Sequence, residues 1–72
     1  MIDTKQFIRE LKTYGVMWCE DEQRHLIANE PLTNKDMKIM CSNKYGDEYN
    51  DLNNTQRTKV RMAIFRGIKN GD

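Results

Sequence analysis

Residues 16–29 read VMWCEDEQRHLIAN, and this stretch decides the fold because it is compatible with two different structures. As a helix, it would place the acidic residues 20–22 toward the positive end of the helix dipole. Trp18, Cys19 and Leu26 would then share one face, and the intrinsic helix propensity is good throughout. The helix is the favoured interpretation of this stretch.

A β-hairpin at about residues 16–28 is the alternative. Val16 would then pair with Ile27, and a second pair would join Trp18 to His25, so that β-branched and aromatic side chains pack across the two strands. The connecting loop, EDEQ, contains none of the Gly, Asn or Pro residues that favour a tight turn. This missing turn chemistry is the reason why the helix is preferred.

Start and stop signals predict a helix before this stretch, between Asp3 and Gly15. Asp3 is an N-cap residue, Gln6 follows it three positions later, and Gly15 favours the left-handed conformation that ends helices. The buried side of this helix is expected to hold Phe7, Ile8, Leu11 and Tyr14.

The same signals predict another helix from Thr33 to about Lys44. Thr33 is the expected cap, Asp36 is the reciprocal acid of a capping box, and Gly46 is the stop. Its buried side is expected to hold Met37, Met40, Cys41 and Tyr45. Residues 47–53, DEYNDLN, are expected to form a polar acidic loop.

The last helix is predicted at residues 54–71, NTQRTKVRMAIFRGIKNG, which has the clearest helical periodicity in the chain. Asn53 and Asn54 supply an N-cap, and Gly71 supplies the left-handed stop. The apolar stripe of this helix consists of Val60, Ala63, Ile64, Gly67 and Ile68. The chain is therefore predicted to be one all-α domain over residues 1–72, a bundle of three to four short helices, with the α+β fold as the alternative.

The net charge of +1 hides a strong separation of charge along the chain. Residues 1–52 contain seven Lys/Arg and ten Asp/Glu, a net −3, whereas residues 53–72 contain five and one, a net +4. The whole molecule therefore gives no polyelectrolyte argument for nucleic acid or membrane, and positive surface belongs to the last helix. No apolar run has the length of a transmembrane helix, so no membrane partner is predicted.

No metal, cofactor, small-molecule substrate or enzymatic activity is predicted. Cys19, His25 and Cys41 are too few and too widely spaced for a zinc site. Residues 47–53 lack the Gly and Glu that a calcium-binding loop requires. The sequence contains no motif that pairs a nucleophile with a general base, and it contains no glycine-rich loop of the kind that binds phosphate. Two cysteines in a chain without a signal peptide predict free buried thiols and a cytoplasmic location.

A second face of the last helix indicates binding of a protein. Met62 and Phe65 point away from the apolar stripe, and basic residues surround them. Large apolar residues in such a setting are either the other half of a core or an anchor for a partner. Our leading hypothesis is a non-enzymatic regulatory protein that binds an acidic protein surface, or a second copy of itself. The predicted contact residues are Arg61, Met62, Phe65, Arg66 and Lys69.

The alternative function is a small dimeric DNA-binding transcriptional regulator that uses the same helix. Its predicted contacts are Gln56, Arg57, Thr58, Lys59 and Arg61. The last two predicted helices resemble the outline of a helix-turn-helix, but residues 45–53 make a longer connection than the three or four residues typical of that motif. In general character the small, charge-dense chain, with its five methionines, resembles accessory proteins of bacteriophages and mobile elements. This resemblance implies a regulatory binding protein.

Overall fold

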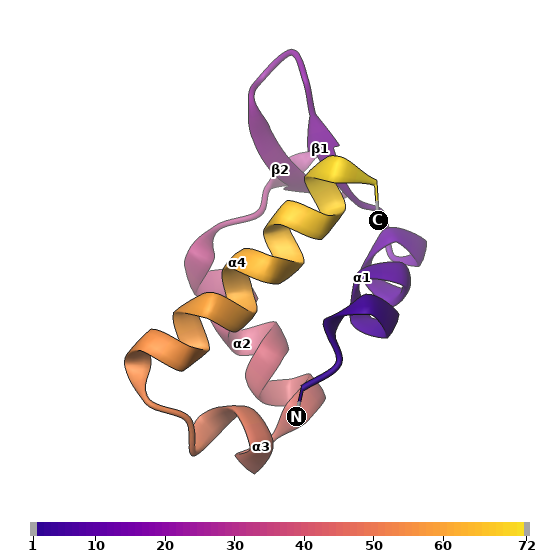
Figure 1. Cartoon of the computed structure of the whole chain (residues 1–72). Coiled ribbons are helices and arrows are strands. Elements are labelled where there is room, and N and C mark those ends of the chain that lie inside the picture. Colours follow the sequence, from indigo (N-terminus) through magenta and orange to yellow (C-terminus); the bar gives the residue numbers. More distant parts are fainter. Residues whose placement is uncertain (1, 72) are drawn as a thin grey trace.

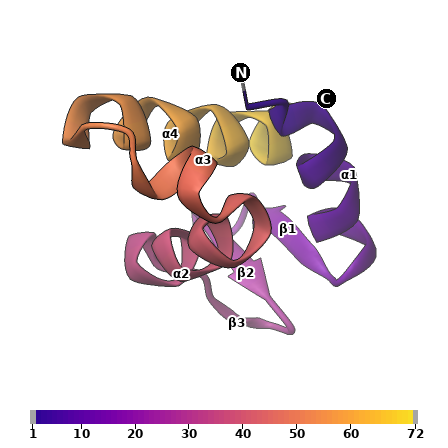
Figure 2. The same cartoon turned by 90° about the horizontal axis from the view of Figure 1, so that it is seen from below.

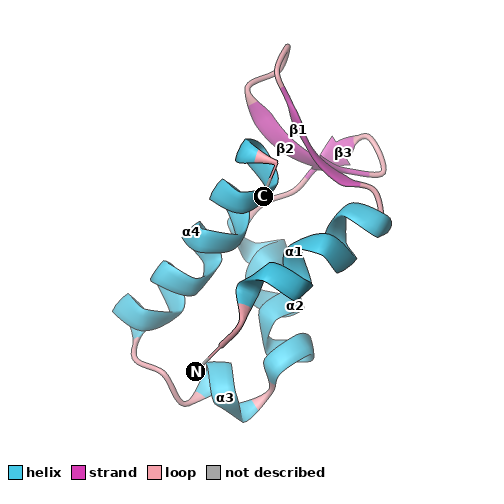
Figure 3. Cartoon of the chain, turned by 45° about the vertical axis from the view of Figure 1, so that its right-hand side comes forward, coloured by secondary structure: helices cyan, strands magenta, loops and turns pink. Residues whose placement is uncertain are grey.

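The computed structural model describes residues 2–71 and shows an α+β domain (Figures 1 and 3). The elements are α1 (Thr4–Thr13), β1 (Val16–Cys19), β2 (Arg24–Ile27), β3 (Glu30–Pro31), α2 (Asn34–Tyr45), α3 (Asp47–Asn50) and α4 (Asn54–Asn70). The strands lie together at one end of the molecule, beside the C-terminal end of α4, and α3 lies at the other end (Figure 3). The predicted all-α bundle is therefore wrong, and the α+β alternative is correct.

Residues 16–29 contain the first two strands of an antiparallel sheet with the order β1-β2-β3. Val16 lies opposite Ile27 and Trp18 lies opposite His25, in the register that the hairpin interpretation predicted. A second turn, at Ala28, joins β2 to the short β3, and neither this turn nor β3 was predicted from the sequence. Ala28 and the following asparagine both have positive φ, of 51° and 66°, as two-residue hairpin turns require.

Burial, rather than turn chemistry, favours the hairpin over a helix. Val16 is only 2% exposed and Leu26 only 5%, and burying each side chain stabilises the fold by about 1.5–3 kcal/mol. Gln23 adopts the left-handed conformation, with φ of 54°, at a cost of about 1–2 kcal/mol for a residue with a Cβ. Its side-chain amide donates a hydrogen bond of 2.6 Å to the carbonyl of Glu20, which closes the loop. The packing gain therefore exceeds the cost of an unfavourable turn residue.

The predicted helix caps are confirmed. Asp3 caps α1 by accepting a hydrogen bond from the backbone N–H of Lys5. Thr33 forms the predicted capping box with Asp36, and α4 begins with a second capping box, made by Asn53 and the glutamine three residues later. Gly46 and Gly71 end α2 and α4 with positive φ values of 60° and 78°.

Two local predictions are wrong. Tyr14 follows the end of α1 and is 75% exposed, so it does not belong to the buried side of that helix. Residues 47–50 form the short helix α3 instead of a loop. Tyr49 from α3 is only 3% exposed, and burial of this large ring holds the segment against the body of the domain.

Helix α4 contacts α1, α2 and β1, and Ile64, Gly67 and Ile68 of its predicted apolar stripe are buried there. Val60 is partly buried, and Ala63 is exposed, so its predicted place on the buried side is wrong. Figure 2 shows α4 along one side of the molecule, with α2 and the strands on the opposite side. Ile64 is fully buried, and so are Met37 and Cys41 from α2. A Cβ atom on Gly67 would lie 2.3 Å from Cδ1 of Ile8, so the glycine permits a close approach of α1 to α4. Within residues 2–71, no helix has the length and apolarity needed to cross a membrane.

Candidate partner-binding groove

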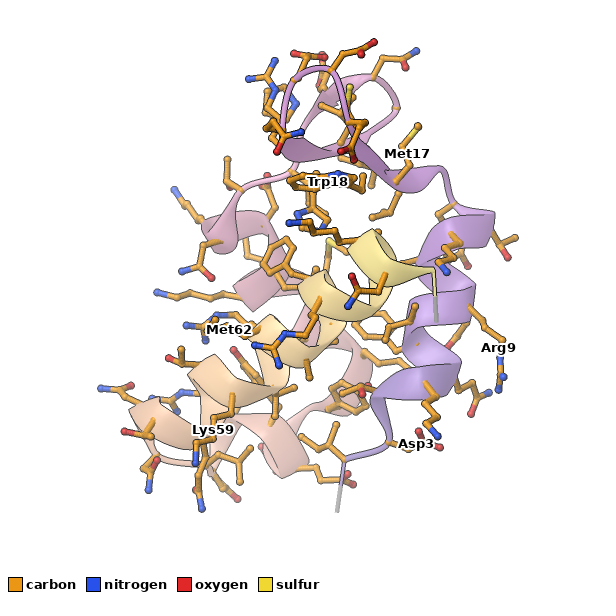
Figure 4. All side chains as sticks on the ribbon, turned by 45° about the horizontal axis from the view of Figure 1, so that its top comes forward. Asp3, Arg9, Met17, Trp18, Lys59 and Met62 are labelled. Atoms are coloured by element: carbon orange, nitrogen blue, oxygen red, sulfur yellow. The ribbon has the colours of Figure 1, made fainter. Side chains whose placement is uncertain are left out.

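The hairpin and the C-terminal half of α4 enclose a surface groove of about 510 Å³. We call this the hairpin groove, and it is lined by Trp18, His25, Met62, Phe65, Arg66, Lys69 and Asn70. Figure 4 shows Trp18 and Met62 on the two elements that form it. Four of the five residues predicted to bind a partner therefore share one concave surface. Trp18 and His25 were not predicted as site residues because a helix was expected there. The hairpin alternative already placed these two residues opposite each other.

Three rings and a cation form a continuous layer across the hairpin groove. The ring centroids of Trp18 and His25 are 4.9 Å apart, and those of His25 and Phe65 are 4.7 Å apart. The ammonium of Lys69 lies 4.6 Å from the centroid of Trp18, a cation–π distance. These contacts fix the hairpin against α4 and hold a positive charge at the edge of the groove.

The imidazole of His25 connects the two elements by a hydrogen bond. Its Nε2 lies 2.7 Å from the backbone carbonyl oxygen of Phe65, and the ring donates this bond when Nε2 carries the proton. Burial lowers the pKa of His25 below its ordinary value of 6.5, and the positive charge of Lys69 lowers it further, whereas the bond to the Phe65 carbonyl opposes these effects. The neutral ring is therefore the favoured form at neutral pH.

Met62 and Phe65 have different environments, although the sequence left the same two interpretations open for both. Met62 is 54% exposed. Phe65 is partly buried, contacts His25 and packs against the core. The core interpretation therefore applies in part to Phe65, and Met62 remains an exposed apolar side chain in a concave surface.

Arg61 does not belong to the hairpin groove, and its predicted position among the exposed basic residues is wrong. It is only 7% exposed, and it is held by three hydrogen bonds. Its Nε donates to Asn34 Oδ1 at 2.8 Å, its Nη1 to the Tyr49 hydroxyl at 2.7 Å, and its Nη2 to Thr58 Oγ1 at 3.2 Å. Arg61 comes directly after Val60 of the apolar stripe in the sequence. It is covered by polar groups of α2 and α3, namely the side chains of Asn34 and Tyr49.

The residues predicted for DNA contact differ in their exposure and in the hydrogen bonds that they make. Gln56 uses its side-chain oxygen to accept from the backbone N–H of Asn53 at 3.1 Å, in the capping box. Arg57 donates to the carbonyl of Asn50 at 2.9 Å and to the side chain of the residue that begins α4. The Thr58 hydroxyl donates to a backbone carbonyl one turn earlier. Gln56, Thr58 and Lys59 are exposed on the helix surface, whereas Arg57 is partly buried and Arg61 is buried.

The two cysteines are free thiols with different exposure. Cys41 is completely buried, and burial raises its pKa to about 11, against the smaller lowering effect of the Arg61 charge. Cys19 is partly exposed, which differs from the predicted burial of both. Within residues 2–71, no three His, Cys, Asp or Glu side chains converge in a way that could hold a metal ion.

No family model, curated protein or solved structure matches this chain.

Proposed function

We propose that this chain is a regulatory protein that acts by binding a protein partner in the hairpin groove. The observation that carries this proposal is the position of Met62, which is 54% exposed inside a groove that also presents Arg66 and Lys69. When a partner covers an exposed apolar side chain in a concave surface, burial of that apolar area stabilises the complex. The nearby cations select which partner does so.

The chemistry of the groove defines the partner as an acidic segment that carries a large apolar side chain. The apolar group would pack against Met62, whose unbranched side chain adapts to different shapes, and against the exposed part of Phe65. Carboxylates on either side would approach Arg66 and Lys69. The groove volume of about 510 Å³ suits a few side chains of a short segment rather than a whole domain face.

Selection from a displayed random-peptide library against the immobilised full chain tests this proposal. We expect enrichment of peptides with Asp or Glu close to a large apolar residue. Met62→Ser should weaken their binding by about tenfold or more, as expected for loss of a central apolar contact. Met62 is the suitable position for this test because Phe65 also packs against the core, so its replacement would alter folding.

A matched pair of charge reversals separates the groove from the general charge of α4. Lys69→Glu and Lys59→Glu change the net charge equally, but only Lys69 lines the hairpin groove. We expect binding to be lost in the first variant and retained in the second. Equal losses in both variants, or selected peptides without an acidic and apolar pattern, would refute the proposal.

A further inference from the structure

The N-terminal half of α4 borders a second cavity, of about 460 Å³, that differs in chemistry from the hairpin groove. We call it the basic pocket. Its lining includes three cationic side chains and three hydroxyls: Lys38, Arg57, Arg61, Ser42, Tyr49 and Thr58. The remaining lining residues are two asparagines, so no carboxylate lines this pocket. A pocket with this lining is complementary to an anion.

Arg61 is the key to the pocket because its charge is buried without a counter-ion. The side chain is 7% exposed, and its three hydrogen bonds all go to neutral oxygen atoms. Within residues 2–71, no carboxylate lies at ion-pair distance from it. Removing a guanidinium from water without a negative partner costs several kcal/mol, and an anion in the pocket would offset this cost.

Unused hydrogen-bond donors point to the same conclusion. A guanidinium has five N–H groups, so the three bonds of Arg61 leave one donor each at Nη1 and Nη2. The Tyr49 hydroxyl accepts from Arg61, and its own proton has no acceptor among the described residues although the side chain is only 3% exposed. Arg57 is held in place by two neutral oxygens and likewise has no acidic partner in the described chain.

We infer that the basic pocket binds a phosphate dianion, either free or as the terminal group of a small phosphomonoester. Guanidinium groups and hydroxyls donate several directed bonds to tetrahedral oxyanions, and Lys38 adds a third positive charge from α2. The three cations converge on one concavity instead of following an extended line. This arrangement favours a compact anion over the backbone of duplex DNA. The inference does not depend on the hairpin groove, which is lined by other residues.

Nuclear magnetic resonance titration of the isotopically labelled full chain tests the inference, with inorganic phosphate and glycerol 3-phosphate as probes. Sodium chloride at matched ionic strength is the reference. We expect saturable shifts of the Arg57 and Arg61 side-chain Nε–H signals with both phosphate probes and not with chloride. Phosphate should also raise the thermal midpoint relative to chloride, because a ligand that binds only the folded state stabilises it.

Variants assign the effect to the pocket. Lys38→Gln and Arg57→Gln should each weaken phosphate binding by about tenfold, the loss expected for one charge-assisted contact. Lys59→Gln removes one positive charge from the same helix outside the pocket and should bind as the wild type does. Replacement of Arg61 is avoided because its bonds hold α2, α3 and α4 together.

Three outcomes would overturn the inference. Chloride could produce the same shifts as phosphate, which would mean that the shifts report ionic strength and not binding of phosphate. The Lys38→Gln and Lys59→Gln variants could bind phosphate equally. Short duplex DNA could saturate the same arginine signals while inorganic phosphate does not, which would assign these residues to a nucleic-acid backbone instead.

Discussion

The two ends of α4 carry positive charge in two different physical settings. Near the C-terminal end, Arg66 and Lys69 are exposed, and the Lys69 ammonium lies over the ring of Trp18. Near the N-terminal end, Arg61 is buried and bonded to neutral oxygens, and Arg57 is partly buried. In the functions proposed above, the exposed charges next to apolar surface would steer and select a partner, whereas the buried charges without acidic neighbours would attract a compact anion. One helix can therefore present two separate surfaces within a length of about 25 Å.

The largest effect is expected from a pair of adjacent residues on α4. Arg61→Ala should destabilise the fold by about 3 kcal/mol, because the loss of three hydrogen bonds, of the packed side-chain stem and of the donor to the buried Tyr49 hydroxyl outweighs the desolvation cost that is recovered with the charge. Met62→Ala should change stability by less than about 0.5 kcal/mol, because the side chain is exposed. Urea unfolding of both variants measures the difference. Similar losses in both would remove the distinction between a buried Arg61 and an exposed Met62.

The middle of α4 is expected to show an intermediate effect. Gly67→Ala should destabilise the fold by about 1–2 kcal/mol, because the added Cβ would lie 2.3 Å from Cδ1 of Ile8, so that either the Ile8 side chain leaves its rotamer or the two helices move apart. Thermal unfolding measures this loss, and the exposed Ala63→Gly change is a control for helix propensity alone. A stabilising effect of Gly67→Ala would mean that α1 and α4 do not approach closely at Ile8 and Gly67.

The cation–π contact at the hairpin end should give a smaller effect. A double-mutant cycle with Trp18→Leu and Lys69→Met should show a coupling energy of about 0.5–1 kcal/mol, as found for exposed pairs. A parallel cycle with Lys59→Met should show no coupling, since Lys59 does not line the hairpin groove. Additive effects in the first cycle would mean that Lys69 is free to move away from the ring.

The smallest effect is expected from the titration of His25. Its pKa in the folded state is lowered from 6.5 by burial, so the unfolded chain binds more protons in the range just below that value. Stability should therefore be highest above pH 6.5 and should decrease as the pH falls from 6.5 toward the folded-state pKa. Unfolding curves of the wild type and of His25→Gln, which keeps a donor for the Phe65 carbonyl, isolate this contribution. An unchanged pH dependence in the variant would show that His25 does not cause it.

The sequence by itself determined the helix ends. Thr33 and Asp36 form the expected capping box, Asn53 is the expected N-cap of α4, and Gly71 ends α4 in the left-handed conformation. These signals are reliable here because a cap depends on groups within about four residues of one another. The buried positions of the α4 stripe, apart from the exposed Ala63, were predicted for the same reason, since helical periodicity is also local.

Only the tertiary structure decided residues 16–29 and the exposure of individual side chains on α4. The hairpin exists because Val16 of β1 is buried in the core and Leu26 of β2 is buried as well, and this gain exceeds the cost of a non-glycine turn residue. Arg61 and Met62 are neighbours in the chain, yet one is 7% and the other 54% exposed. Which of them is covered depends on where α2, α3 and the hairpin lie in space, and that arrangement follows from long-range packing that no local pattern contains.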